Sequence, residues 1–400
     1  MKPKLLLLAS RFPYPLIGGD RIKLFATLEI LSCKYEVYFV LISHTALSKE
    51  DIARIEPLCK ELKIFYKSKF SSYLKAFRAI FSGESLQVGY YYFSDVAHFI
   101  NTLLQKEQIN IAISVLIRTA KYMLDKNLAV NIVDITDSIA INYKRSMKNT
   151  QSLFWKSIYF IESRRLAHFE TKCVESFDAS LFVNKFEALA YKDKGNAILI
   201  PHGSNEALLN YTPNTKKQAQ YKNAICFFGK MDYQPNIDAC LYFAHKVMPL
   251  LAQSKHKFRF LIIGANPSEK ILSLQSTQTQ ILGFVQDPYE ILSNALCIVA
   301  PMQSGGGIQN KILESLALGQ IVVTNNLGAN PIYQAKDKEH LLLANTPQEF
   351  TDTILQIAQY PESYNALKNN ARALIRQNYT WQVFGEKLLG IIKHIKDSKC

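Results

Sequence analysis

Short runs of aliphatic residues recur along the chain, and longer segments of mixed polarity separate them. In the first half, the apolar runs occupy residues 4–10, 35–43, 110–116, 130–136, 179–184 and 197–201. Residues 21–32 and the stretch from Ser48 onward, which lie between these runs, have the spacing of amphipathic helices. Strands that alternate with helices predict an open, mostly parallel sheet with helices on both faces.

A second series of the same kind follows. Its apolar runs lie at residues 224–229, 258–264, 279–285, 296–301 and 320–325, and helices are predicted at 237–252, 268–274, 288–294 and 308–318. The polar residues 211–223 separate the two series and predict a linker. We therefore predict an α/β protein with doubly wound domains at 1–204 and 205–380, and a terminal helix, 381–400, that belongs with the first domain.

Composition adds limits on location and partners. The 400 residues exceed the length at which a single hydrophobic core usually keeps growing, which agrees with two domains. The seven cysteines form neither a CxxC pair nor a Cys/His cluster, which favours a reducing compartment. No run reaches the roughly 18 apolar residues of a membrane span. A formal net charge of +14 favours an anionic partner, which leaves nucleic acid, anionic lipid and phosphorylated small molecules as candidates.

Two of the predicted strands end in glycine turns of a kind that binds phosphate. Doubly wound sheets bind ligands beyond the carboxyl ends of their strands, where glycine lets an anion approach the backbone. One turn holds Gly18 and Gly19 just before a helix. In another, Lys230 follows a strand-end glycine directly and can meet phosphate oxygens. An ordinary turn and a solvated lysine are the alternatives.

A third turn contains three consecutive glycines, residues 305–307, before a predicted helix. The N–H groups of a helix's first turn have no acceptor inside the helix, so this turn favours an anion without any side chain. Glu314 lies inside the helix that follows, where it can accept hydrogen bonds from ribose hydroxyls. A merely solvated glutamate is the alternative.

The order of these motifs resembles that of family-four glycosyltransferases, which are retaining enzymes of the GT-B architecture. RFPYPLIGGDRIK is similar to the N-terminal glycine loop of bacterial polysaccharide-assembly members, and IPHGSN to the turn between their domains. FFGKMDYQPNIDACLYF matches the opening of the donor domain, FLIIGANP and ILGFVQDPYEIL its strand ends, and SGGGIQNKILESLALGQIVVTN its donor-binding helix. Nearly the whole chain takes part in the resemblance, including YTW before the last helix, which in this family returns to the N-terminal domain.

This resemblance implies two Rossmann-like domains that face a cleft and an enzyme of cell-surface polysaccharide synthesis, such as that of capsule or lipopolysaccharide. The substrates would be a nucleoside-diphosphate sugar and a glycan or lipid-linked acceptor. Gly18 and Gly19 would approach the donor diphosphate, and Lys230 would neutralise it during catalysis. The phosphate cradle would be completed by Gly307, Ile308, Gln309, Asn310 and Lys311. Glu314 would bind the ribose, with Gly283 and Phe284 near the base.

The chain also departs from the family pattern. The family often has a Glu-x7-Glu pair, and Gly306 stands at its first position here. Asn236 occupies the place of a second basic residue six positions after Lys230. A histidine at the end of an N-terminal strand has no match, and Asp137 lies roughly there. We take Asp137 as the candidate acceptor-side base, because a partly desolvated carboxylate can have a raised pKa; an Asx turn or helix cap is the alternative.

We expect no metal and no other cofactor. A lysine and helix N–H groups can neutralise a leaving diphosphate, and no Asp-x-Asp motif precedes a plausible donor pocket. Basic and aromatic residues interleave in segments 60–81 and 144–165, which favours an anionic membrane surface as a partner; two helices with buried aromatic faces are the alternative. Nucleic acid is not expected, because no binding module accompanies the charge.

The sequence therefore predicts a cytoplasmic protein, and the two basic segments leave open peripheral attachment to the inner face of the cytoplasmic membrane. Other classes of protein also stay open. One is a catalytically inactive GT-B-like protein that binds nucleotide, and another is a membrane-associated partner protein. A GT-B sugar-nucleotide epimerase would need acids that converge on the sugar, and Gly306 argues against it.

Overall fold

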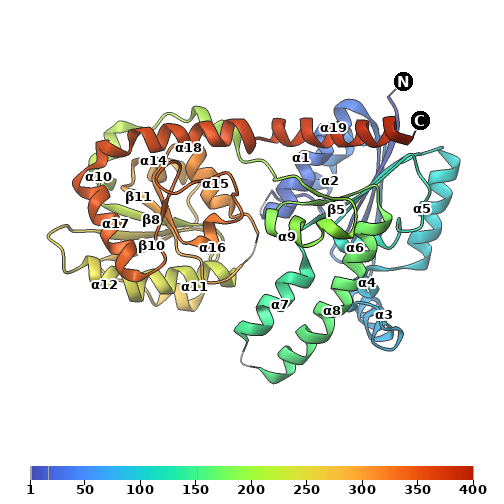
Figure 1. The fold of residues 1–400 in the computed structure, drawn as a ribbon, viewed down its shortest axis with the longest axis horizontal. Helices are drawn as coiled ribbons and strands as arrows, with labels where there is room; N and C mark the ends of the chain where they lie inside the picture. The colour runs from blue at the N-terminus through green and yellow to red at the C-terminus, as the bar shows by residue number, and fades with distance from the viewer. Residues whose placement is uncertain (1, 17, 151, 306, 400) are drawn as a thin grey trace. The chain divides into compact units, whose positions relative to one another are not determined.

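The computed structural model of the protein describes residues 2–16, 18–150, 152–305 and 307–399. It divides into two compact units (Figure 1). Unit 1 comprises residues 1–201 and 384–400, and unit 2 comprises residues 202–383. The predicted boundaries after residues 204 and 380 lie close to this division.

Unit 1 is built on a parallel sheet. Within the described residues, its strands lie in the order β3-β2-β1-β4-β5-β6-β7. The interior strands read as continuous aliphatic runs because helices cover both faces of the sheet, and Leu5 to Leu8 of β1 have no exposed surface. The bounds are β1 (Lys4–Ala9), β2 (Glu36–Ser43), β3 (Glu61–Tyr66), β4 (Ile111–Val115), β5 (Val130–Thr136), β6 (Ala179–Phe182) and β7 (Ala197–Leu199).

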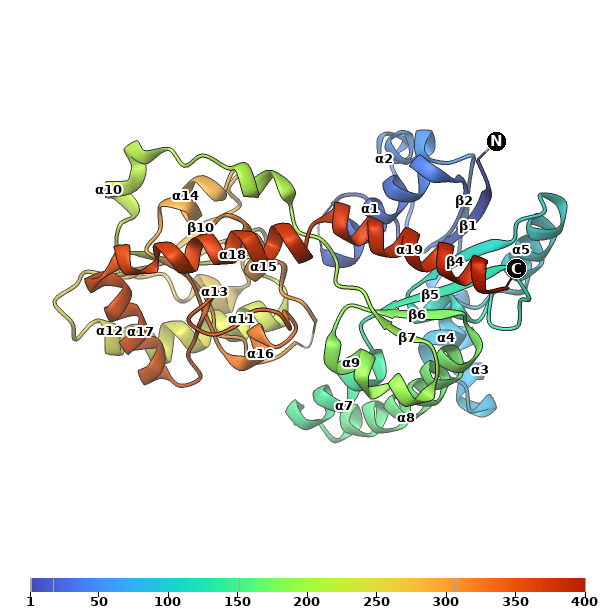
Figure 2. The same cartoon turned by 45° about the horizontal axis from the view of Figure 1, so that its top comes forward.

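Helices connect these strands, as the alternating pattern predicts. α5 and α8 contribute apolar side chains to the core on one face of the sheet. Figures 1 and 2 both show α3, α7 and α8 on the side of unit 1 away from α19. The bounds are α1 (Gly19–Lys34), α2 (Lys49–Ile55), α3 (Lys69–Ser82), α4 (Leu86–Tyr91), α5 (Ser94–Lys106), α6 (Ile117–Ala120), α7 (Ile139–Asn149), α8 (Leu153–Ser176) and α9 (Lys185–Ala190).

Unit 2 repeats this architecture. Its parallel strands lie in the order β10-β9-β8-β11-β12-β13 within the described residues. The strand bounds are β8 (Ala224–Phe228), β9 (Arg259–Ile263), β10 (Thr279–Gly283), β11 (Cys297–Ala300), β12 (Val322–Thr324) and β13 (Leu342–Leu343). The helix bounds are α10 (Gln218–Tyr221), α11 (Gln234–Tyr242), α12 (Met248–Leu251), α13 (Glu269–Leu272), α14 (Tyr289–Asn294), α15 (Asn310–Ala317), α16 (Asn326–Ala329), α17 (Pro347–Gln359) and α18 (Asn365–Asn378).

The last helix, α19 (Trp381–Lys399), begins in unit 2 and continues in unit 1 from Phe384 onward. In unit 1 it contacts α1: a Cβ on Gly385 would lie 3.2 Å from the side chain of Ile30. The predicted return of the C-terminal helix to the first domain is therefore confirmed. In the described part of the chain, none of the helices combines the length and apolar composition that a membrane span needs.

The predicted strands of both series are confirmed, and two strands that were not predicted are present. β3 occupies the first part of the basic segment 60–81, which is therefore not helical throughout. Its alternating pattern of exposed and half-buried residues is typical of an edge strand, and a short edge strand carries a weak apolar signal. β13 is two residues long and was missed for the same reason.

Candidate functional site

The topology of unit 2 marks a position where ligands bind in doubly wound sheets. The chain runs outward from β8 through β9 to β10 on one side, and from β11 through β12 to β13 on the other. Such sheets bind ligands where the strand order reverses, at the carboxyl ends of the strands. The turns that follow β8 and β11 hold Lys230 and the glycine segment, so two of the three predicted phosphate-binding turns leave from neighbouring strands.

Three glycines bring the carboxyl ends of β8, β9 and β10 together. The N–H of Gly264 donates to the carbonyl oxygen of Gly283 over 2.8 Å, and a Cβ on Gly264 would lie 1.7 Å from the carbonyl oxygen of Gly229. Only glycine fits at position 264. Gly283 therefore lies at the same sheet edge as Gly229, and Phe284 follows it with 76% of its surface exposed. Contact of Gly283 and Phe284 with a base stays a prediction.

Lys230 lies at the rim of this edge with an exposed side chain. Its Nζ is 3.3 Å from Asp232 Oδ2, and the two side chains are 52% and 40% exposed. An exposed ion pair of this kind contributes little to stability. An incoming anion can therefore take the place of Asp232 as the partner of Lys230 at small cost.

Lys311 lies inside the unit rather than at the rim, with 7% of its surface exposed. Its Nζ donates to Asn236 Oδ1 over 2.9 Å and to Gln309 Oε1 over 3.1 Å. Asn236 Nδ2 donates in turn to the carbonyl oxygen of Lys230 over 2.8 Å. Burial lowers the pKa of Lys311 to about 8, and the negative charge of Glu314 opposes this shift. Asn236 thus connects the Lys311 ammonium group to the turn that carries Lys230.

Glu314 is partly buried on α15, one turn beyond Lys311. The hydroxyl of Tyr289 donates to Glu314 Oε2 over 3.1 Å. Burial raises the pKa of Glu314 to about 7, and the bond from Tyr289 and the charge of Lys311 oppose this shift. Tyr289 was missed in the sequence; it is the first residue of α14 and lies within DPYEIL, where no local pattern indicates a contact with Glu314.

The start of α15 offers backbone donors. No side chain caps the helix at Gln309, and the N–H groups of a first helical turn have no acceptor within the helix. Gln309 Nε2 donates to the carbonyl oxygen of Gly307 over 3.1 Å, and Asn310 Oδ1 is buried without a hydrogen-bond partner among the described residues. Ile308 lies in the same loop. Gly306, where the chain departs from the Glu-x7-Glu pattern, lies outside the described residues.

The first glycine turn lies in unit 1, at that unit's own reversal of strand order between β1 and β4. Gly18 has a φ of +102°, which favours glycine, and Gly19 begins α1. From this helix the buried Lys23 reaches Asp134 Oδ1 over 2.7 Å, so Asp134 is a structural ion-pair partner. The approach of Gly18 and Gly19 to a donor diphosphate stays a prediction.

Asp137 follows β5 directly, after Thr136 with its left-handed φ of +67°. Its Oδ1 is buried without a hydrogen-bond partner among the described residues. Burial raises the pKa of Asp137 to about 6, against the opposing charge of Lys23. The alternative role as a helix cap is wrong, because Ser138 is the N-cap of α7 and its side chain accepts from the N–H of Ile141.

Two buried glutamates that the sequence did not indicate surround this strand end. Glu187 has no exposed surface and accepts from the N–H of Ser138 over 2.6 Å. Burial raises the pKa of Glu187 to about 8, and the nearby charge of Asp137 adds to the rise. Glu170 accepts from the Ser138 hydroxyl over 2.6 Å, and burial raises its pKa also. Several protonatable carboxyl groups thus lie at the carboxyl edge of the unit 1 sheet.

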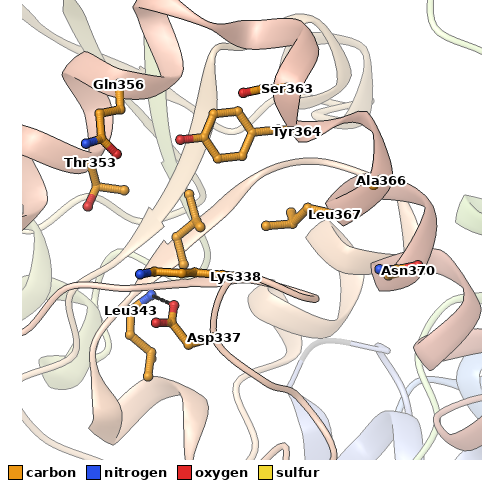
Figure 3. A pocket seen from close by; sticks show the side chains of 11 residues that line it. Asp337, Lys338, Leu343, Thr353, Gln356, Ser363, Tyr364, Ala366, Leu367 and Asn370 are labelled. Atoms are coloured by element: carbon orange, nitrogen blue, oxygen red, sulfur yellow. Dashed lines mark hydrogen bonds between the residues drawn. The ribbon is translucent and has the colours of Figure 1, made fainter.

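A pocket of about 340 Å³ lies elsewhere in unit 2 (Figure 3). It is lined by residues of β13, α17 and α18, by Ser363 and Tyr364 between these two helices, and by the loop that carries Asp337 and Lys338. None of its lining residues comes from the turns after β8 and β11, so the pocket is separate from the candidate site.

The described residues contain no group of three or more His, Cys, Asp or Glu side chains that could hold a metal ion. The expectation that the protein needs no metal stays a prediction.

Comparison with known proteins finds a matching family model and a relative. Residues 222–360, which contain Lys230, Lys311 and Glu314, match the family model described as "Glycosyl transferases group 1". An "uncharacterized 44.6 kDa protein in cps region" of Klebsiella pneumoniae is 20% identical over 394 residues, which cover 94% of this chain and 96% of that protein.

Solved structures show the same fold. The Anabaena protein HepE in complex with UDP superposes with a TM-score of 0.64 at 12% identity, over 98% of this chain and all of that one. WaaG, "a glycosyltransferase involved in lipopolysaccharide biosynthesis", has a TM-score of 0.64 at 12% identity, over 97% of this chain and 99% of that one. The chain thus has the GT-B fold of two Rossmann-like units, and residues 222–360 of its second unit are similar to the group 1 glycosyltransferases.

Proposed function

We propose that the protein is a retaining, family-four glycosyltransferase that moves a sugar from a nucleoside-diphosphate sugar to a glycan or lipid-linked acceptor in the synthesis of a cell-surface polysaccharide. The donor class is supported by the match of residues 222–360 and by HepE, whose structure contains UDP. The polysaccharide is suggested by the relative from a cps region and by WaaG. Capsule and lipopolysaccharide are both compatible with these relatives.

The observation that carries the proposal is the contact between Lys311 and Asn236 in unit 2. In the family pattern, a second basic residue is expected at position 236, and this chain has asparagine there. The Lys311 ammonium group lies 2.9 Å from that asparagine. We infer that Lys311 supplies from α15 the positive charge that position 236 lacks. The donor site then keeps two lysines, Lys230 at the rim and Lys311 inside.

These groups suit the chemistry of sugar transfer. Departure of the sugar leaves negative charge on the diphosphate, and cations and N–H donors held in place around it lower the barrier. Lys230, Lys311 and the first N–H groups of α15 would supply that stabilisation. We propose that no metal is required, because these groups neutralise the same charge.

Glu314 would hold the nucleoside in the same site. A carboxylate that accepts hydrogen bonds from both ribose hydroxyls fixes the sugar of the nucleotide, and such charged hydrogen bonds are about twice as strong as neutral ones. Tyr289 already orients Glu314 Oε2. Gly283 and Phe284 would then lie near the base.

On the acceptor side, we propose Asp137 as the general base. Asp137 is half-buried, and its Oδ1 has no hydrogen-bond partner among the described residues, so the carboxylate can accept a proton from a hydroxyl group. With its pKa raised to about 6, the carboxylate is ionised at neutral pH yet basic enough to take part in proton transfer.

The test is turnover of a panel of nucleotide sugars. The wild type is incubated with UDP-glucose, UDP-galactose, GDP-mannose and ADP-glucose, and released nucleoside diphosphate is measured with and without a lipid extract as the acceptor source. One donor should be consumed, and Asp137→Asn should slow its consumption by about 100-fold or more while binding of the nucleotide is unchanged. Nucleotide binding without turnover of any donor would instead identify a catalytically inactive member of the fold.

A further inference from the structure

The exposed apolar side chains of the protein are concentrated on two helices of unit 1. Among the described residues, twenty large hydrophobic side chains are exposed, and eleven of them belong to α3 or to the first half of α8. We call these eleven the aromatic surface; they are Phe70, Tyr73, Leu74, Phe77, Ile80, Phe81, Leu153, Phe154, Trp155, Phe160 and Ile161. Exposed apolar residues of folded proteins are normally scattered, and a contiguous group marks an interaction site.

α3 buries its small residues and exposes its aromatic ones, which is the reverse of an ordinary amphipathic helix. The residues that it buries are small, Ser72 and Ala79, whereas Phe70 and Phe81 are 73% and 78% exposed. A Cβ on Gly89 of α4 would lie 2.7 Å from the Cβ of Ala79, so α4 fits closely against this small-residue side. The sequence alternative in which the aromatic residues of this segment are buried is therefore wrong for α3.

Direct contacts join α8 to the C-terminal end of α3 and to the residues that follow it. The guanidinium group of Arg165 on α8 donates to the carbonyl oxygens of Ile80 and Glu84, at 3.0 and 3.2 Å. The hydroxyl of Ser85 donates to the buried Glu162 of α8 over 2.5 Å. Both views of the fold show α3 beside α8 (Figures 1 and 2).

The two stretches of chain that carry the aromatic surface are basic. Residues 67–83 and 138–161 contain no aspartate or glutamate, and lysines and arginines recur through both stretches. Of the glutamates that follow them directly, Glu162 is buried and Glu84 pairs with Lys121. Lys69, Arg78 and Lys144 are exposed, and Arg164 lies 3.9 Å from the centre of the Phe160 ring. Aromatic side chains interleaved with cations match the interface of an anionic bilayer, where rings enter the headgroup region and cations meet lipid phosphates.

We propose that the aromatic surface, with the basic residues around it, binds the protein to an anionic lipid bilayer. The inference is independent of the donor chemistry, since unit 1 alone carries the surface. Such a surface would hold the enzyme where a lipid-linked acceptor resides.

The test measures cosedimentation of the full chain with vesicles of phosphatidylcholine alone or with 30% phosphatidylglycerol, the latter being a composition chosen to be roughly that of an anionic leaflet. The test variants are F77S/F81S and K69Q/R78Q. The matched control is Tyr360→Ser, because Tyr360 is an exposed aromatic residue of unit 2. Melting temperature and nucleotide binding show that each variant is folded.

Wild type and Tyr360→Ser should bind the anionic vesicles at least about tenfold more strongly than the neutral ones, and salt should weaken this binding. F77S/F81S should lose about tenfold in binding to anionic vesicles, and K69Q/R78Q should lose the preference for them. Equal binding of wild type and F77S/F81S would overturn the proposal. So would a wild type that ignores vesicles but self-associates through these residues, because the surface would then contact a second copy.

Discussion

Lys311 carries its ammonium group inside unit 2, where burial lowers its pKa to about 8 and Asn236 accepts its hydrogen bond. A bound diphosphate favours the charged form of this lysine. Binding is therefore accompanied by protonation of Lys311 once the pH exceeds the pKa of this lysine in the free protein. The titration of Lys311 thus gives nucleotide binding a specific dependence on pH.

We predict that affinity for the preferred nucleoside diphosphate falls above about pH 8, approaching about tenfold per pH unit. Lys311→Met should weaken binding at pH 7 by about 10- to 100-fold, because a charged hydrogen bond is lost, and should remove the alkaline decline. Calorimetric titration between pH 7 and 9.5 measures both effects. Lys270→Met, at an exposed lysine of the same unit, is the control, and an unchanged alkaline decline in Lys311→Met would refute the assignment.

Glu314 is assigned to the ribose, which separates its role from that of the lysines. Glu314→Gln should weaken binding of the nucleoside diphosphate by about tenfold and leave binding of inorganic pyrophosphate unchanged. Lys311→Met should weaken binding of both ligands. A loss of pyrophosphate binding in Glu314→Gln would show that Glu314 acts on the phosphate site instead.

Sequence reasoning finds the turn residues of this site but not their contacts. Lys230 and the glycines stand out because each follows a strand end. The bond between Lys311 and Asn236 joins residues 75 positions apart, and that between Tyr289 and Glu314 joins residues 25 apart. Both depend on how the loops after neighbouring strands converge, which no local pattern specifies.

At the scale of elements, the end of β5 and the start of α7 collect carboxyl groups inside unit 1. Burial raises the pKa of Asp137 to about 6 and that of Glu187 to about 8. In the unfolded chain both groups ionise near their ordinary values of about 4. Between these values the unfolded state has lost protons that the native state retains, so stability falls as the pH rises from about 4 to about 8.

Glu187→Gln should remove part of this dependence. The variant should melt about 2–6 °C above the wild type at pH 8.5, and the difference should shrink as the pH falls toward 5. Differential scanning calorimetry at a series of pH values measures it, with Glu61→Gln at an exposed glutamate of β3 as the control. A difference of the same size at pH 5 and 8.5 would contradict the buried, protonated state of Glu187.

The elements themselves could be predicted where burial on both faces gives continuous apolar runs, as in β1 and β11. β3 could not, since only one face of an edge strand is covered. The side of α3 that faces inward could not be predicted either. Aromatic residues at helical spacing are typical of a buried face, and here Ser72 and Ala79 are buried instead.

For the whole molecule, two parallel-sheet units, each with a reversal of strand order, account for the GT-B fold and for the place of the candidate residues. The order of motifs predicts this architecture because each motif marks a strand end. The nucleotide base, the sugar and the acceptor depend on side-chain geometry around these ends, which the order of motifs does not specify.

The central claim is that unit 2 binds a nucleoside diphosphate through Lys230, Lys311 and Glu314. The most direct measurement is a thermal-shift titration of the full chain with UDP, GDP, ADP, CMP and TDP, repeated with Lys230→Ala and Glu314→Ala. One nucleoside diphosphate should raise the melting temperature by several degrees at about 100 times its dissociation constant, and both substitutions should abolish that rise at the same concentration. No stabilisation of the wild type by any of the five at millimolar concentration would contradict the account.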